Sequence, residues 1–167
     1  MLSKPSGKWL AFAALLSLGA AGAGTPDAAF AGETGKIKTR AVLVTTKQTM
    51  TTLEDVKDHT LLYLEQDGMI VSAGGGFLEK ARYQLFYLSD SSSMVAGGYK
   101  TFTTADGSKV FAKFSDTEQA PPIYKGTVEF TGGTGKYAGL KGKGVWTYTT
   151  ISDAVAMDEM EGEYELP

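Results

Sequence analysis

The stretch that decides the fold of this chain is Thr131-Gly-Gly-Thr-Gly-Lys-Tyr-Ala-Gly-Leu-Lys-Gly-Lys-Gly144. It holds six glycines in fourteen residues and lies between two runs that are typical of β-strands. Each glycine costs a helix interior about 1 kcal/mol relative to alanine, whereas glycine permits positive φ and close approach of neighbouring backbones. The stretch therefore predicts a kinked β-hairpin, with structural positions at Gly132, Gly133, Gly135 and Gly139.

Two nucleotide-binding motifs partly match this stretch, and the sequence argues against both. A phosphate-binding loop needs glycine where Phe130 stands, and Ser or Thr where Tyr137 follows the Gly-Lys pair. The dinucleotide pattern fits 133–138 but must open a helix, which the later glycines disfavour.

Strand-like segments separated by turn residues continue on both sides of the hairpin. Asp67-Gly68 is typical of a hairpin turn, and Asp106-Gly107 marks another. Leu53–Lys57 fits either a single helical turn or a loop. The pattern predicts an all-β domain of eight or nine strands, either a sandwich or a closed antiparallel barrel. The expected strands are 36–44, 59–66, 69–72, 81–88, 99–104, 108–114, 123–130, 145–151 and 160–166.

The first and last strands carry opposite charges. Basic side chains alternate with uncharged residues along 36–41, and acidic side chains do so along 160–166. Opposed charges on paired strands contribute up to about 1 kcal/mol each, and pairing these two strands would remove both sheet edges. We therefore predict a closed barrel; two separate, solvated edge strands are the alternative. The basic row (Lys36, Lys38, Arg40) should face the acidic row (Glu161, Glu163, Glu165) outside, with Ile37, Ala41, Met160 and Tyr164 inside.

The first 31 residues are typical of a signal peptide. Lys4 and Lys8 precede an apolar run, Trp9–Ala21, that is too short to span a membrane. Ala29-Phe30-Ala31 fits the small-x-small pattern of a cleavage site. We predict cleavage after Ala31 and one domain over 32–167, exported to the periplasm or the extracellular space. Cleavage after Ala23 and an uncleaved membrane anchor are the alternatives.

Composition narrows the classes of partner and cofactor. The formal net charge is −3, which argues against nucleic acid as the main partner. The chain has no cysteine, so neither a disulfide nor a thiolate ligand for a metal is available. It has one histidine, and no second apolar run reaches membrane length. We expect no metal, no cofactor and no membrane contact after cleavage.

Several segments together resemble a known superfamily. Thr103-Thr-Ala-Asp-Gly-Ser108, then Phe114 and Val128–Gly144, are similar to the allene oxide cyclase and dirigent barrel proteins. The resemblance extends over Thr60–Ile151, is most specific at the Thr-Gly-Gly-Thr-Gly hairpin, and looks closest to exported bacterial members of unassigned function. It implies an eight-stranded antiparallel barrel with an apolar interior, and a homotrimer. The hairpin is structural in that family, so the resemblance transfers no catalytic residue.

Two residues are candidates for catalysis. His59 follows Asp58 at the start of a strand and would suit a general base, although a hydrogen-bonded histidine at a barrel rim fits as well. Glu65 lies in an apolar strand, where a cavity-facing carboxyl would have a raised pKa, although an outward glutamate fits the pattern too.

Aromatic residues supply the ligand-binding candidates. An eight-stranded barrel is just wide enough to be filled by side chains or to hold one small ligand. The candidates are Tyr63, Tyr124, Phe130, Trp146 and Tyr148. We expect an exported protein that binds a small apolar or aromatic molecule. The alternatives are a cyclase or isomerase that controls the conformation of an apolar substrate, and a packed scaffold that presents loops to a partner protein.

Overall fold

The computed structural model describes residues 32–167 except 75 and 94; the predicted signal peptide, residues 1–31, lies outside the described residues. The described part is almost entirely β-structure, with one short 3-10 turn, η1 (Gly135–Tyr137). The strands are β1 (Glu33–Thr52), β2 (Thr60–Ser72), β3 (Arg82–Asp90), β4 (Val95–Thr103), β5 (Lys109–Ala120), β6 (Ile123–Gly133), β7 (Lys141–Thr150) and β8 (Val155–Leu166).

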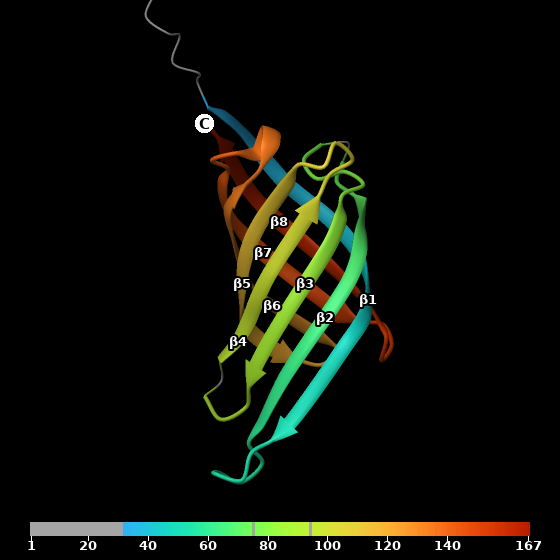
Figure 1. The fold of residues 1–167 in the computed structure, drawn as a ribbon, viewed down its shortest axis with the longest axis vertical. Helices are drawn as coiled ribbons and strands as arrows, with labels where there is room; N and C mark the ends of the chain where they lie inside the picture. Colours follow the sequence, from blue (N-terminus) through green and yellow to red (C-terminus); the bar gives the residue numbers. More distant parts are fainter. Residues whose placement is uncertain (1–31, 75, 94) are drawn as a thin grey trace, which may run out of the picture.

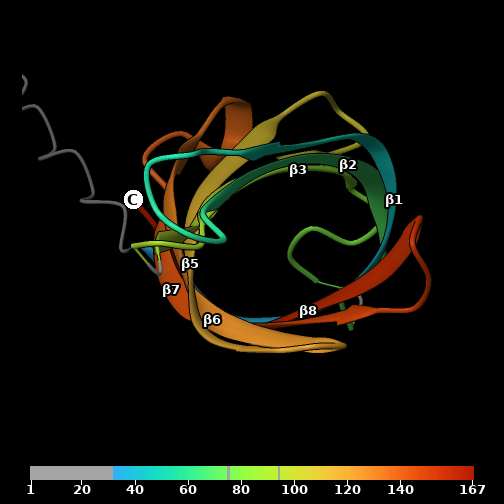
Figure 2. The same ribbon diagram turned by 90° about the horizontal axis from the view of Figure 1, so that it is seen from below.

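These strands form a closed antiparallel barrel in chain order (Figures 1 and 2). This confirms the predicted fold. The β1–β2, β3–β4, β5–β6 and β7–β8 loops share one end, here called the lower end, where the β1–β2 hairpin extends past the other strands (Figure 1). The other three loops lie at the upper end.

Pairing of β1 with β8 closes the barrel, as the charge pattern predicts. Lys36 pairs with Glu163 and Lys38 with Glu161, while Arg40 pairs with Glu159. The Nζ of Lys38 lies 3.2 Å from Glu161, and the guanidinium of Arg40 lies 2.8 Å from Glu159. The predicted inward positions are also confirmed: Ile37, Ala41 and Met160 are buried, and Tyr164 packs against the core.

Aromatic side chains fill the upper part of the barrel. Phe77, from the β2–β3 loop, stacks on Tyr164 with ring centroids 4.3 Å apart. Its ring also meets Phe130 at 5.8 Å and Tyr137 at 5.6 Å, both edge to face. Because these side chains occupy the upper end, space for a ligand remains at the lower end.

One predicted turn is wrong, and the structure shows the conformation of one segment for which the sequence left two alternatives. Asp67-Gly68 is not a turn, because β2 runs straight through it and Gly68 pairs with Leu43 on β1 and Tyr83 on β3. A Cβ on Gly68 would collide with the carbonyl oxygen of Val42, so glycine here permits two strands to approach closely. Leu53–Lys57 is a loop rather than a helical turn.

The glycine-rich stretch forms the end of β6, η1 and the start of β7. Gly135 and Gly139 have φ of 59° and 79°, which favour glycine over other residues. Gly132 has a φ of 147°, whereas Gly133 is outside the positive range and is constrained by close neighbours instead. The stretch is thus the kinked β-hairpin that its composition predicts.

Candidate functional site

A cavity of about 440 Å³ lies at the lower end of the barrel. Its lining comes from every strand except β4 and from the β7–β8 loop. Strand alternation decides which side chains enter it. On β5, Val110, Ala112 and Phe114 face inward and are buried, and Asp116 is the next residue on that face. The same rule turns Leu62, Leu64 and Gln66 of β2 toward the cavity.

Aromatic side chains form one part of the cavity wall. Phe114 meets Trp146 edge to face at 5.2 Å between ring centroids, and Tyr124 meets Tyr148 in the same way at 6.0 Å. Trp146 pairs with Gly126 across β6 and β7. A Cβ on Gly126 would lie 2.7 Å from the indole nitrogen, so glycine leaves room for the ring. These rings offer flat apolar surfaces to a bound molecule.

Asp116 places a carboxyl group in this wall. The Tyr87 hydroxyl donates a hydrogen bond of 2.9 Å to Asp116 Oδ2. The other oxygen, Oδ1, is buried and has no hydrogen-bond partner among the described residues. Burial raises the pKa of Asp116, and hydrogen bonding from Tyr87 and Gln119 and the charge of Lys100 oppose this effect. Burial likewise raises the pKa of Tyr87. Asp116 is therefore a ready acceptor for a ligand group that donates a hydrogen bond.

A buried ion pair lies next to the aromatic wall. Lys100 Nζ is 2.7 Å from Asp158 Oδ2, and neither side chain is exposed. The Tyr83 hydroxyl donates to the same oxygen at 2.7 Å. Lys100 Nζ also lies 4.9 Å from the ring centroid of Phe114 and 5.0 Å from that of Trp146, both of which line the cavity. Burial lowers the pKa of Lys100, and Asp158 opposes this shift.

Hydrogen bonds of the Gln66 side chain connect β2 to β7 at the cavity. The Gln66 side chain donates hydrogen bonds to the Tyr148 hydroxyl at 2.8 Å and to the Thr45 hydroxyl at 3.1 Å. Burial raises the pKa of Tyr148, and its hydrogen bond with Gln66 opposes this shift. These contacts fix the orientation of the Tyr148 ring in the wall.

The structure brings together three of the five predicted aromatic residues. Tyr124, Trp146 and Tyr148 line the cavity. Phe130 is buried in the core and packs on Phe77 toward the upper end. Tyr63 alternates with the cavity-lining Leu62 and Leu64, so it lies on the outer face of β2. The residues that the sequence reasoning missed are Gln66, Tyr83, Tyr87, Lys100, Asp116 and Asp158.

Glu65 lies on the outer face of β2. Its carboxylate accepts a hydrogen bond from the Tyr63 hydroxyl and lies 3.6 Å from Lys47 Nζ. Because its neighbours Leu64 and Gln66 face the cavity, Glu65 points away from it. The carboxyl that does face the cavity belongs to Asp116.

His59 connects two loops at the lower end and does not line the cavity. Its side chain is only 7% exposed; Nδ1 lies 2.7 Å from Asp55 and Nε2 lies 2.9 Å from Asp90. An imidazole donates to two carboxylates only when both nitrogens carry hydrogen, so this geometry fits the charged form. Hydrogen bonding to Asp55 raises the pKa of His59. The contact with Asp55 and Asp90 leaves neither ring nitrogen free as a general base.

We expect this contact to make stability depend on pH. A raised pKa in the folded state gives stability that is fully present below the unfolded histidine pKa of about 6.5 and is lost as the pH rises through the folded value. The excess Tm of the wild type over His59→Gln should therefore be largest at acidic pH and shrink toward alkaline pH. Thermal melts of both proteins across this range measure it. Parallel Tm curves would contradict a charged His59.

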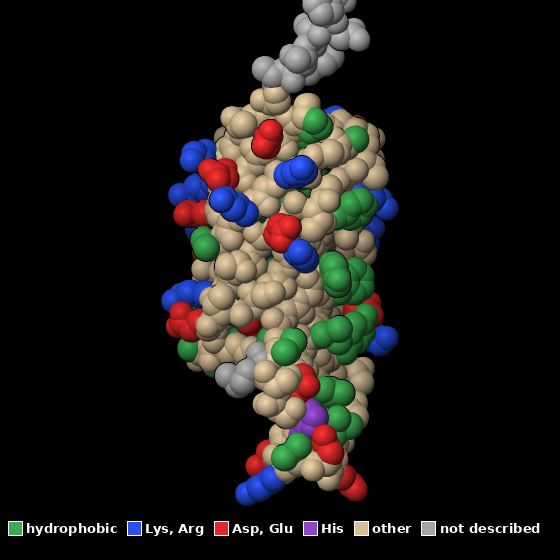
Figure 3. Space-filling model, turned by 90° about the vertical axis from the view of Figure 1, so that its left-hand side faces the viewer, with side chains coloured by type: hydrophobic (Ala, Val, Ile, Leu, Met, Phe, Trp, Pro, Cys, Tyr) green, Lys and Arg blue, Asp and Glu red, His purple; other side chains and the backbone are tan. Residues whose placement is uncertain are grey.

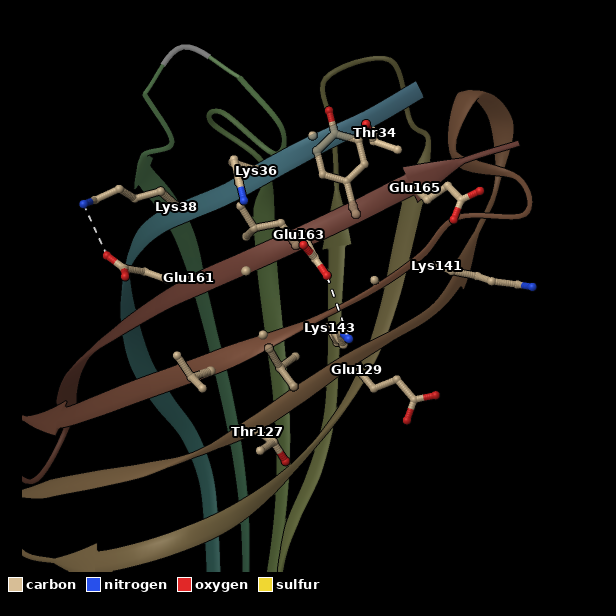
Figure 4. A pocket seen from close by; sticks show the side chains of 18 residues that line it. Thr34, Lys36, Lys38, Thr127, Glu129, Lys141, Lys143, Glu161, Glu163 and Glu165 are labelled. Carbon is tan, nitrogen blue, oxygen red and sulfur yellow. Dashed lines mark ion pairs between the residues drawn. The ribbon is translucent and has the colours of Figure 1, made fainter. Parts of the chain in front are cut away.

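A second hollow is shallow and lies on the outside of the barrel. Lysine and glutamate side chains from β1, β6, β7 and β8 surround it (Figure 4). Lys38 pairs with Glu161, Lys143 lies 3.9 Å from Glu163, and Glu129 lies 3.0 Å from Lys113 on β5. Because these charges neutralise one another on an open surface, the aromatic cavity is the better candidate site.

Within residues 32–74, 76–93 and 95–167, no cluster of three or more histidine or carboxylate side chains is arranged to hold a metal ion. No helix in the same ranges has the length and apolar character needed to cross a membrane.

Comparisons with known proteins identify the fold. No protein-family model matches the chain, and no curated protein matches it. Among solved structures, the pterocarpan synthase dirigent protein GePTS1 matches with a TM-score of 0.55 and 14% identity, over 81% of this chain and 86% of that one. The pterocarpan synthase dirigent protein PsPTS1 gives 0.51 and 15%, over 80% and 95%. A pyocyanin demethylase gives 0.46 and 14%, over 75% and 98%. The chain therefore has the dirigent-like barrel fold implied by the sequence resemblance.

Proposed function

We propose that this protein is exported and binds one small aromatic or apolar molecule in the barrel cavity. The observation that carries the proposal is the cavity of about 440 Å³ at the lower end, walled by Phe114, Tyr124, Trp146 and Tyr148. This volume falls within the range of about 300–1,000 Å³ that is usual for small-molecule sites. A cavity too small for a ligand would favour the packed scaffold, and this volume favours binding instead.

The proposal also includes export of the protein and its association with a second copy of the chain. The apolar run Trp9–Ala21 and the small residues before Gly32 support a signal peptide. Exposed apolar side chains gather along one side of the barrel (Figure 3). Those on adjoining strands include Leu61, Leu88, Val95, Tyr99 and Phe111. A contiguous apolar patch of this kind supports contact with a second copy of the chain.

Mass spectrometry of the protein purified from its own host tests these points together. Under native conditions we expect a non-covalently bound small molecule and a mass that corresponds to an oligomer. Under denaturing conditions the intact mass should place the N-terminus at Gly32, or at Gly24 if the earlier site is used. A ligand-free protein that no aromatic compound stabilises would contradict binding. A mature chain that retains Met1 would contradict export by cleavage.

One observation favours an enzyme of the cyclase or isomerase type as a second candidate. The carboxyl group of Asp116 lines the cavity, has a raised pKa and is bonded to the Tyr87 hydroxyl, so it is suited to donate or accept a proton. Two solved structures with this fold are named as pterocarpan synthases, so the fold occurs in proteins that are named as enzymes. Conversion of the retained molecule to an isomer by the wild type, but not by Asp116→Asn, would favour the enzyme over simple binding.

A further inference from the structure

The charges around the cavity do not balance. The lining residues include two carboxylates, Asp116 and Asp153, and no lysine, arginine or histidine from the described part of the chain. The nearest buried cation, Lys100, is already paired with Asp158 at 2.7 Å. The charge of Lys100 also lowers the pKa of Asp116, so when Asp116 and Asp158 are both ionised this single buried lysine faces two carboxylates and one negative charge is left in excess.

One carboxyl oxygen of Asp116 has no hydrogen-bond donor among the described residues. Its Oδ2 accepts from Tyr87, whereas Oδ1 is buried without a partner in the ranges that the structure describes. Buried acceptors in proteins are nearly always paired, and an unpaired one calls for an explanation. A ligand group that carries an N–H would supply the missing donor, and a positively charged one would also supply the missing charge.

The aromatic wall is suited to the same ligand group. Ring faces carry negative electrostatic potential and attract cations within about 6 Å of the ring centroid. The Lys100 ammonium already makes cation–π contacts with Phe114 and Trp146, at 4.9 and 5.0 Å from the ring centroids. Tyr124 and Tyr148 line the same cavity and present two further rings to its contents.

From these observations we infer that the cavity binds an aromatic organic amine in its protonated form, with the ammonium group at Asp116 and the aromatic part against Trp146 and Tyr148. This inference rests on the proposed binding function and names the class of ligand. A neutral aromatic molecule would leave the Asp116 charge unbalanced. An aromatic carboxylate would be repelled by both Asp116 and Asp153.

Three matched probes test the inference by isothermal titration calorimetry at neutral pH. They share one ring system and differ in the terminal group: 2-(2-naphthyl)ethylamine, 2-(2-naphthyl)ethanol and 3-(2-naphthyl)propionate. We expect the amine to bind about tenfold more tightly than the alcohol, and the carboxylate to bind most weakly. In Asp116→Asn the ratio of amine to alcohol affinity should fall to about one.

A matched variant controls for net charge. Asp67→Asn removes the same charge from the outer face of the barrel, where Asp67 lies 3.4 Å from Arg82, and should leave the ratio unchanged. An amine that binds no better than the alcohol, or a ratio that survives Asp116→Asn, overturns the inference while alcohol binding preserves the proposed function. Failure of all three probes to bind, together with a ligand-free protein from the host, overturns both.

Discussion

Replacing Lys100 by methionine is expected to lower the free energy of unfolding by about 3–5 kcal/mol, because it leaves a buried carboxylate without its counter-charge. Lys100 and Asp158 are both fully buried and 2.7 Å apart. Once Lys100 is removed, only the Tyr83 hydroxyl still bonds to Asp158 Oδ2. Methionine fills a similar volume, so the loss reports the charge rather than a large cavity. Urea denaturation of the wild type and Lys100→Met measures it.

Two further variants test whether burial of the unpaired charge causes the loss of stability in Lys100→Met. The double variant Lys100→Met/Asp158→Leu removes both charges and should recover most of the lost stability, since apolar replacements of buried ion pairs are often neutral. Lys38→Met breaks the exposed pair with Glu161 and should cost less than about 1 kcal/mol. An effect of Lys100→Met no larger than that of Lys38→Met would show that the interior pair does not stabilise the barrel.

Closure of the barrel could be predicted from the sequence because the relevant pattern is local to each terminal strand. Charges at alternate positions on 36–40 and 161–165 identify an outer face on each strand, and their opposite signs suggest that the strands pair. The exact register did not follow from charge alone. Arg40 pairs with Glu159, outside the predicted acidic row, because the ladder continues beyond the segment expected to be strand.

The polar interior was missed because lysine and aspartate are usually assigned to the surface. Alternation did contain the signal. Asp158 is two residues before Met160, which was predicted to point inward, and Lys100 is two residues before Phe102, which is fully buried. What the sequence does not contain is the pairing itself, since Lys100 and Asp158 are brought together only by the barrel.

Predictions from adjacent residues failed where contacts with residues farther along the chain determine the structure. Asp67-Gly68 is typical of a hairpin turn, yet Gly68 lies within β2, where glycine is needed because the Val42 carbonyl approaches too closely for any side chain. His59 is oriented by Asp55, four residues earlier, and by Asp90, far along the chain, rather than by the adjacent Asp58. The decisive neighbour of Gly68 lies on β1, and His59 is held by Asp90 at the end of β3 together with Asp55 in its own loop.

The second large loss of stability is expected in the glycine hairpin. Gly133→Val is expected to destabilise the protein by about 3 kcal/mol, because overpacking against backbone cannot be relieved by a side-chain rotation. A Cβ at this position would lie 2.5 Å from the Lys109 carbonyl oxygen and 2.7 Å from the Tyr137 carbonyl oxygen. Since Gly133 is outside the positive range of φ, the cause differs from the positive φ that its place in the stretch suggested.

A variant of a second glycine distinguishes the cost of close approach from the cost of backbone strain. Gly107 has a φ of 82°, and nothing lies near a Cβ built on it, so Gly107→Val tests positive φ alone and should cost about 1–2 kcal/mol. Chemical denaturation of both variants should therefore rank Gly133→Val as the more severe. Equal losses would indicate that the close approach at Gly133 costs no more than positive φ alone. Wild-type stability in Gly133→Val would show that β5 and η1 can move apart at Lys109 and Tyr137, so that the hairpin would not need glycine at this position.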